Sequence, residues 1–312
     1  MALHPVLEKM LETNRSAGRP AIASCSPDEA RTLLSASAVA LGEGPQVGQI
    51  SDLLIPTRSG SMPGRLFRAG MQEKGLIVYI HGGGWVIGAF KDFDALARTL
   101  VARSGSALLM VDYRLAPEHK FPAGLEDVED AIRWAAAQRH QLIGPGTRLV
   151  VAGDSAGANL ATVAVTVLKN EIEIASQLLI YPVADCDFET PSYRLPAEGL
   201  FLTRDDMQWF YRHYAPPALW SDPRISPLRA NDLKGAAPAW IAVAEHDVLH
   251  DEAVAYAERL TAAGVSVELH RYAGVGHGFA RMMNLVDTAD RALDDAASAI
   301  RKGQVVKICG KC

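Results

Sequence analysis

Residues 148–169 read RLVVAGDSAGANLATVAVTVLK. The first five residues form a short apolar run typical of a buried strand, and a helical pattern starts at residue 156. Between them lies Gly153-Asp154-Ser155-Ala156-Gly157, the one G-x-S-x-G motif of the sequence. A serine on a sharp strand-to-helix turn is exposed above the sheet, and the helix N-terminus offers N–H groups to developing negative charge. Ser155 is therefore a candidate nucleophile; the alternative is a Gly-rich turn that closes tightly or binds phosphate.

Seven further runs of β-branched or aliphatic residues, bounded by turn residues, predict strands near 50–55, 64–69, 76–80, 107–112, 177–181, 239–244 and 265–271. Together with 156–169, helical periodicity predicts helices over 92–104, 123–139, 251–263 and 285–301. The later strands are continuously apolar, which favours a parallel sheet covered on both faces. The alternation of eight strands with helices predicts a doubly wound α/β sheet.

Two segments do not fit this alternation. Residues 1–45 predict two helices before any strand, and Ser26-Pro27-Asp28-Glu29 is a start signal for the second. Residues 183–225 lie between two strands and hold a helix start at 203–206, followed by four aromatic residues. We expect both segments to lie outside the sheet.

Composition excludes several classes of protein. The chain has 312 residues, 49% of them hydrophobic, which excludes wholesale disorder. Its net charge of −5 disfavours nucleic-acid and anionic-membrane partners, which require clustered positive charge. No apolar run approaches the ~18 residues of a membrane span, and the N-terminus lacks the apolar region of a signal peptide. We therefore expect a cytoplasmic protein without membrane insertion.

The cysteines and histidines give no convincing metal site. Cys25, Cys186, Cys309 and Cys312 are too sparse for a disulfide framework, and the terminal CGKC supplies only two of the about four ligands of structural zinc. His246 and His250 are four residues apart, but no Glu separates them as in H-E-x-x-H. We expect no metal.

A glycine-rich loop follows the strand at 76–80. In His81-Gly82-Gly83-Gly84-Trp85, three glycines allow backbone N–H groups to point at one spot, as the oxyanion of an acyl-transfer intermediate requires. We assign the donors to Gly83 and Gly84, together with Ala156. Gly82 is expected to shape the loop and His81 to brace it by hydrogen bonding. A phosphate cradle is the weaker alternative, because the spacing matches no phosphate-binding motif.

A nucleophilic serine needs an imidazole base, which a carboxylate orients, and the chain order in this architecture is Ser, acid, His. His277 follows the last predicted strand within a glycine-rich loop, whereas His270 lies inside that strand and His213 in the 183–225 segment. Asp247 directly follows the apolar strand at 239–244, at the sheet edge where such folds place catalytic groups. Glu245 is a weaker candidate acid, and residues 251–252 are interpreted as the acidic first turn of the next helix.

The combination of motifs resembles the hormone-sensitive-lipase family of bacterial esterases, within the α/β-hydrolases. The resemblance rests on HGGGW at 81–85, YRLAPEHKFPAGLED at 113–127, GDSAG at 153–157, HDVLHDE at 246–252 and GHGF at 276–279. It implies an α/β-hydrolase fold with a mostly parallel sheet and a catalytic triad of Ser155, Asp247 and His277. It also implies a helical cap over the site, so the expected organisation is 1–48 (N-terminal cap helices), 49–182 (core), 183–225 (cap insertion) and 226–312 (core).

The resemblance further implies a serine carboxylesterase that acts on short- to medium-chain acyl esters without a cofactor, and frequent dimerisation, often through the last strand. Val248 and His250 depart from the family's usual D-P-L-R-D motif, which leaves the local charge around the acid open. The same triad would serve a peptidase or amidase, and the same fold a non-catalytic receptor. Apolar candidates for the acyl pocket, which would equally suit a cap core, are Trp85, Tyr181, Phe201, Leu202, Trp209 and Phe210.

Overall fold

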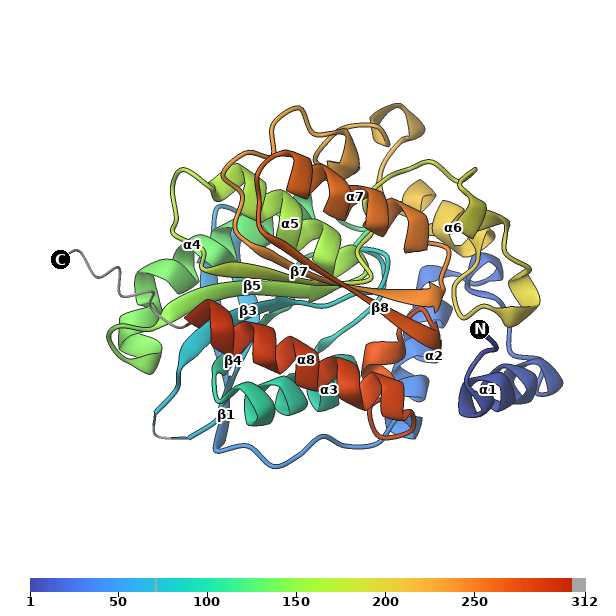
Figure 1. The fold of residues 1–312 in the computed structure, drawn as a ribbon, viewed down its shortest axis with the longest axis horizontal. Helices are drawn as coiled ribbons and strands as arrows, with labels where there is room; N and C mark the ends of the chain where they lie inside the picture. The colour runs from blue at the N-terminus through green and yellow to red at the C-terminus, as the bar shows by residue number, and fades with distance from the viewer. Residues whose placement is uncertain (71, 305–312) are drawn as a thin grey trace.

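The computed structural model describes residues 1–70 and 72–304. An eight-stranded sheet with the order β1-β2-β4-β3-β5-β6-β7-β8 forms its centre (Figure 1). The strands β1 and β2 form an antiparallel hairpin, β2 pairs antiparallel with β4, and the other neighbours are parallel. The bounds are β1 Gln49–Thr57, β2 Gly60–Arg68, β3 Gly75–Ile80, β4 Ala107–Val111, β5 Arg148–Asp154, β6 Ser176–Ile180, β7 Ala239–His246 and β8 Val267–Gly276. The prediction of eight strands in a mostly parallel sheet is confirmed.

Helices cover both faces of the sheet. Figure 1 shows α4, α5 and α7 on one side, and α3 and α8 on the other. Alternate residues of β3 point to opposite faces: Leu76, Val78 and Ile80 join one core cluster, whereas Ile77 and Tyr79 join the second. This explains why the central strands are apolar throughout. The covering helices are α3 Phe90–Ser104, α4 Ala123–Ile143, α5 Ala156–Leu168, α7 His250–Ala262 and α8 Asp287–Gln304.

The two segments predicted outside the sheet contain α1 Pro5–Ser16, α2 Pro27–Ala40 and α6 Arg204–Tyr214. Both predicted helix starts are present as capping boxes, one between Ser26 and Glu29 and one between Thr203 and Asp206. The segments meet where the Ala23 N–H donates to the Asp206 carboxylate at 2.9 Å. The two segments are thus in contact with each other, at the end of the molecule where α2 and α6 lie in Figure 1.

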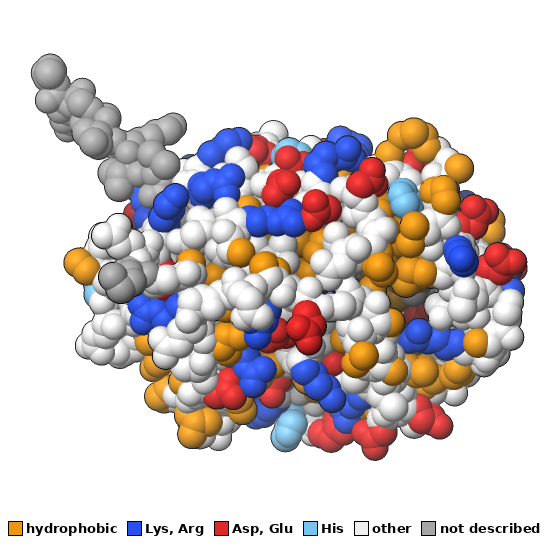
Figure 2. Space-filling view, turned by 90° about the horizontal axis from the view of Figure 1, so that it is seen from below, with side chains coloured by type: hydrophobic (Ala, Val, Ile, Leu, Met, Phe, Trp, Pro, Cys, Tyr) orange, Lys and Arg blue, Asp and Glu red, His pale blue; other side chains and the backbone are white. Residues whose placement is uncertain are grey.

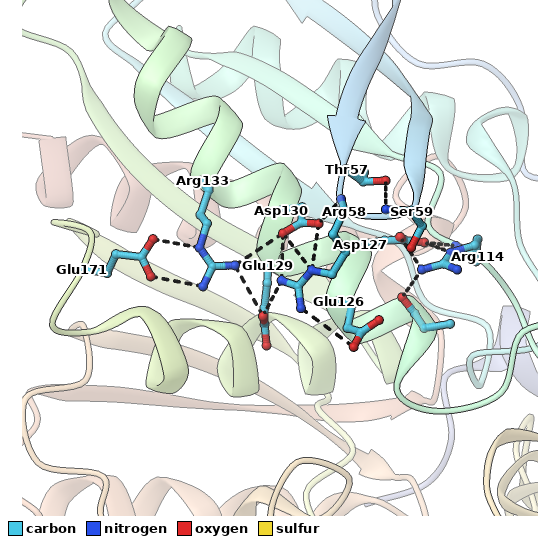
Figure 3. Close-up of polar contacts among 11 residues, drawn as sticks. Thr57, Arg58, Ser59, Arg114, Glu126, Asp127, Glu129, Asp130, Arg133 and Glu171 are labelled. Carbon is cyan, nitrogen blue, oxygen red and sulfur yellow. Dashed lines mark hydrogen bonds and ion pairs between the residues drawn. The ribbon is translucent and has the colours of Figure 1, made fainter.

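A cluster of ion pairs joins the β1–β2 turn to α4 (Figure 3). The Arg58 guanidinium contacts Glu129 at 2.9 Å and Asp130 at 2.8 Å, and Arg133 continues the row to Glu171. Nearby, the two ends of the stretch 113–127 are joined by Arg114, whose guanidinium donates to the buried Asp127 carboxylate. On the face shown in Figure 2, basic and acidic side chains are interspersed.

The ends of the last two strands were predicted too short. The pair β7–β8 continues to His246 and Gly276, beyond a register shift between Ala244 and His246. The glycines after residue 273 suggested a loop, but a bulge lets the strands stay paired, and Gly274 adopts a φ of +69° that suits glycine. The terminal CGKC lies outside the described residues. Within the described ranges, no helix is long and apolar enough to cross a membrane.

Candidate active site

Ser155 lies on the turn between β5 and α5, at φ 55° and ψ −124°. A positive φ with this ψ is strained for a residue with a side chain and persists only where the surroundings hold it. The neighbouring glycines make the turn sterically feasible: a Cβ on Gly157 would lie 2.1 Å from the carbonyl oxygen of Ile80. The small residues of the motif are therefore required by close packing of the turn against β3.

Three chain segments bring the predicted triad together. The Ser155 hydroxyl lies 3.0 Å from His277 Nε2, and His277 Nδ1 lies 2.8 Å from Asp247 Oδ2. The Asp247 side chain is fully buried, and its other oxygen accepts the Leu249 N–H at 3.0 Å. A carboxylate on Nδ1 selects the tautomer whose Nε2 accepts the serine proton. The arrangement can therefore activate Ser155 as a nucleophile.

The glycine loop after β3 faces the serine. The Gly82 N–H donates to Asp154 Oδ1 at 2.9 Å, so this N–H group already has an acceptor. By contrast, the N–H groups of Gly83, Gly84 and Ala156 have no acceptor within residues 1–70 and 72–304. Gly83 and Gly84 have φ values of +115° and +58°. These three backbone N–H groups are therefore free to donate to a bound group, which is a property that the donors of an oxyanion hole need.

His81 is fully buried and sandwiched between the rings of Phe93 and Tyr113, with centroids 5.2 and 4.6 Å away. Its Nδ1 contacts the Gly82 carbonyl oxygen at 2.8 Å, and the Tyr113 hydroxyl donates to the backbone carbonyl oxygen of His81. Burial lowers the pKa of His81 to about 4. A neutral imidazole held in this way fits a bracing residue and not a general base.

Asp154 links the nucleophile turn to the glycine loop, a contact that motif matching alone does not predict. It is buried, and its Oδ1 accepts hydrogen bonds from the Tyr79 hydroxyl at 2.8 Å and from Gly82 at 2.9 Å. Burial raises its pKa above the ordinary value of an aspartate. The signal in the sequence was a charged residue at the end of an apolar strand, where burial demands polar partners.

The six apolar candidates for the acyl pocket separate into two groups. The Phe210 ring packs directly on the glycine loop: a Cβ added to Gly84 would lie only 2.0 Å from this ring. Phe201 packs against Gly276, next to His277, and the ring of Tyr181 lies 4.6 Å from the imidazole of His277. The other three candidates are buried members of the core: Trp85, Leu202 and Trp209. The ring of Trp85 stacks on that of Tyr214.

The weaker candidates have other partners. Glu245 accepts the Gly274 N–H at 2.8 Å and pairs with the amino terminus. His250 Nδ1 contacts the Ala244 carbonyl oxygen at 2.8 Å, and the neighbouring Val248, which departs from the family motif, is fully buried. Within the described ranges, no group of three His, Cys, Asp or Glu side chains could hold a metal ion.

The fold and the arrangement of Ser155, His277 and Asp247 define the α/β-hydrolase class, and a family model described as alpha/beta hydrolase fold matches residues 77–281. The chain belongs to this family, in its hormone-sensitive-lipase branch of esterases. An ethyl acetate hydrolase of Pseudomonas putida is 37% identical, over 97% of this chain and 99% of that protein. A carboxylic ester hydrolase of Mycobacterium tuberculosis is 37% identical, over 96% and 82%.

Solved structures agree with these relatives. A thermostable esterase from Pseudomonas putida has a TM-score of 0.94 at 32% identity, covering 98% of this chain and 99% of that one. A hyperthermophilic esterase from the archaeon Pyrobaculum calidifontis has a TM-score of 0.91 at 35% identity, covering 97% and 99%. The chain is accordingly a carboxylic ester hydrolase.

Proposed function

We propose that Ser155, His277 and Asp247 perform ester hydrolysis through an acyl-enzyme. The uninterrupted row of contacts from the serine hydroxyl through the imidazole to the buried carboxylate carries this proposal. His277 takes the proton as Ser155 attacks the ester carbonyl, and it then protonates the departing alcohol. Water activated by the same imidazole releases the acid.

The oxyanion of each tetrahedral intermediate binds to the N–H groups of Gly83, Gly84 and Ala156. The described part of the chain offers these N–H groups no acceptor, which supports this assignment, since a donor already engaged would have to be released first. Removal of one such donor typically costs about 100–1,000-fold in kcat.

The test is the Ser155→Ala variant assayed with p-nitrophenyl butyrate. We expect complete loss of ester hydrolysis with an unchanged melting temperature and circular dichroism spectrum. Parental activity in Ser155→Ala would refute the proposal. Parallel assays with an ester and an amide of the same acyl group would reveal an amidase, which the esterase names of the relatives do not favour.

Within the ester substrates, we propose a preference for short to medium acyl chains. The Phe210 ring packs on Gly84 of the glycine loop and the Phe201 ring packs on Gly276 beside His277, so bulky apolar groups lie near the reacting centre. The relative named ethyl acetate hydrolase is consistent with a small acyl group. A chain-length series of p-nitrophenyl esters from two to twelve carbons tests this; a maximum at twelve carbons would overturn it.

We propose that residues 1–48 and 183–225 form a cap over the site, on a core of 49–182 and 226–312. The hydrogen bond between Ala23 and Asp206, one from each segment, supports a shared cap.

We further propose a homodimer through β8, an edge strand of the sheet, which light scattering would test. A cytoplasmic location agrees with the free thiols of Cys25 and Cys186; fractionation of the producing cells would check it.

A further inference from the structure

The loop that carries Asp247 is tied to the start of the 183–225 insertion. This acid loop comprises residues 247–251, from the end of β7 into the first turn of α7. The Ser192 hydroxyl donates to the Val248 carbonyl oxygen at 2.6 Å, and the Ser192 N–H donates to Asp251 Oδ2 at 2.8 Å. Ser192, which is 59 positions away from Asp251 in the sequence, thus makes hydrogen bonds to both the backbone and a side chain of the acid loop.

Helix α7 lacks a cap from its own sequence. Its N-cap residue is Leu249, which has no side-chain oxygen to accept the orphan N–H groups of the first turn. Ser192 supplies part of this missing function: its Oγ lies 3.4 Å from the Asp251 N–H, and the Asp251 carboxylate accepts from Ser192 in return. The reciprocal contact resembles a capping box built from two distant segments.

A second tie lies one residue further along α7. The Glu252 carboxylate is buried, and its Oε1 accepts the N–H groups of Ala184 at 2.7 Å and Asp185 at 3.2 Å. Burial raises the pKa of Glu252 well above its ordinary value. Residues 184–192 are thus fixed to α7 at both ends of this stretch.

The insertion also reaches the nucleophile. The Val183 N–H donates to the Ser155 carbonyl oxygen at 3.3 Å. One turn along α5, the side-chain amide of Asn159 donates to the carbonyl oxygens of Val183 and Ile225, at 3.0 and 2.8 Å. Both stems of the insertion are therefore anchored on the helix that follows Ser155.

We propose that Ser192 is a positioning residue for Asp247, through which the insertion holds the acid loop in register with His277. The proposal rests on the function proposed above for the triad. Ser192 touches none of the reacting atoms; it acts through the Val248 carbonyl, one residue from the acid. Loss of the hydroxyl frees that peptide, so Asp247 holds the imidazole less well during proton transfer.

The test compares Ser192→Ala with Ser226→Ala. The control hydroxyl is also buried and donates to a backbone carbonyl, that of Trp220 at 2.6 Å, but it makes no hydrogen bond to residues 247–251. For Ser192→Ala we expect kcat on p-nitrophenyl butyrate to fall about three- to tenfold, as for loss of one hydrogen bond, with KM within about twofold of the parent. Ser226→Ala should retain the parental kcat.

The pH profile separates positioning from general loss of structure. Asp247 orients the imidazole and contacts it directly, so a loosened contact should displace the acid limb of the kcat/KM pH profile in Ser192→Ala. The acidic side chains Asp185, Asp251 and Glu252 are the same in both variants, so the shift cannot arise from a changed charge. Ser192→Cys, which keeps the side-chain size with a weaker donor, serves if the alanine variant is poorly folded.

Parental kcat and pH profile in a folded Ser192 variant would overturn the proposal, as would an equal loss in Ser226→Ala. These outcomes differ from failure of the proposed function, which would appear as activity retained by Ser155→Ala.

Discussion

Replacement of Asp154 by alanine should release the glycine loop from the nucleophile turn. Asp154 is 3% exposed and directly precedes Ser155, and its Oδ1 is the acceptor for both the Tyr79 hydroxyl and the Gly82 N–H. Alanine removes this acceptor and leaves two buried donors without a partner. The variant therefore perturbs the oxyanion loop without touching any group assigned to the reaction.

The structure sets the magnitude. Each unsatisfied buried donor costs about 1–3 kcal/mol, so the free energy of unfolding should fall by about 2–6 kcal/mol. Gly82 directly precedes the two glycines assigned as oxyanion donors. If the released loop misaligns one of them, kcat should fall by about 100–1,000-fold. The loss should appear in kcat more than in KM, because the oxyanion forms only in the transition state.

The assay is steady-state hydrolysis of p-nitrophenyl butyrate, together with urea unfolding. Asp154→Asn is the matched control: its amide oxygen can accept from both donors, so it should lose much less activity and stability than Asp154→Ala. A folded Asp154→Ala variant with kcat within threefold of the parent would show that the Gly82 contact does not hold the oxyanion loop.

Three further predictions address other parts of the molecule. Gly84→Ala should lower kcat/KM at least about 100-fold, because the φ of Gly84 is +58° and the new Cβ would meet the Phe210 ring at 2.0 Å. The control Gly199→Ala, whose Cβ would lie in open space, should be neutral. Equal activities of the two variants would contradict this prediction. Burial holds the pKa of His81 at about 4, below the 6.5 of an exposed histidine, so the unfolded chain binds the proton first. Stability should therefore fall by about 2 kcal/mol between pH 7.5 and 5 through this residue, and urea unfolding of His81→Gln should show a smaller decrease than the parent; an identical decrease would count against it. Arg58→Met should lower the free energy of unfolding by at most about 1 kcal/mol, and this loss should be smaller in 1 M NaCl, while kcat stays unchanged. A large or salt-independent loss would show that the cluster in Figure 3 is more than a surface network.

The sequence predicted the sheet because burial on both faces makes its central strands continuously apolar. The parallel strands β3, β5 and β6 are of this kind, and their predicted bounds differ little from those observed. The prediction failed at strand ends, where a local pattern carries little information. At Gly274 and Gly276, pairing across a bulge overrides the preference of glycine for turns, and only the register with β7 reveals it.

The candidate site shows the same division between local and distant causes. Ser155, Asp247 and His277 could be proposed from sequence because each follows a strand, and carboxyl ends of parallel strands meet at one edge. Residues that hold them could not be proposed in this way. Tyr79 lies 75 positions from Asp154, and a hydroxyl in an apolar strand gives no indication of which acceptor it will meet.

The contacts of Ser192, in the insertion, could not be predicted from the local sequence either. Its sequence context, Pro191-Ser192-Tyr193, indicates a turn and nothing about α7. The acidic pair at 251–252 was interpreted as a response to the helix dipole, but Asp251 and Glu252 both accept backbone N–H groups from the insertion. Because α7 has no cap of its own, that insertion completes a helix of the core and holds the loop of the acid. A segment outside the sheet is therefore part of what places the reacting groups, and its influence on kcat is measurable apart from substrate binding.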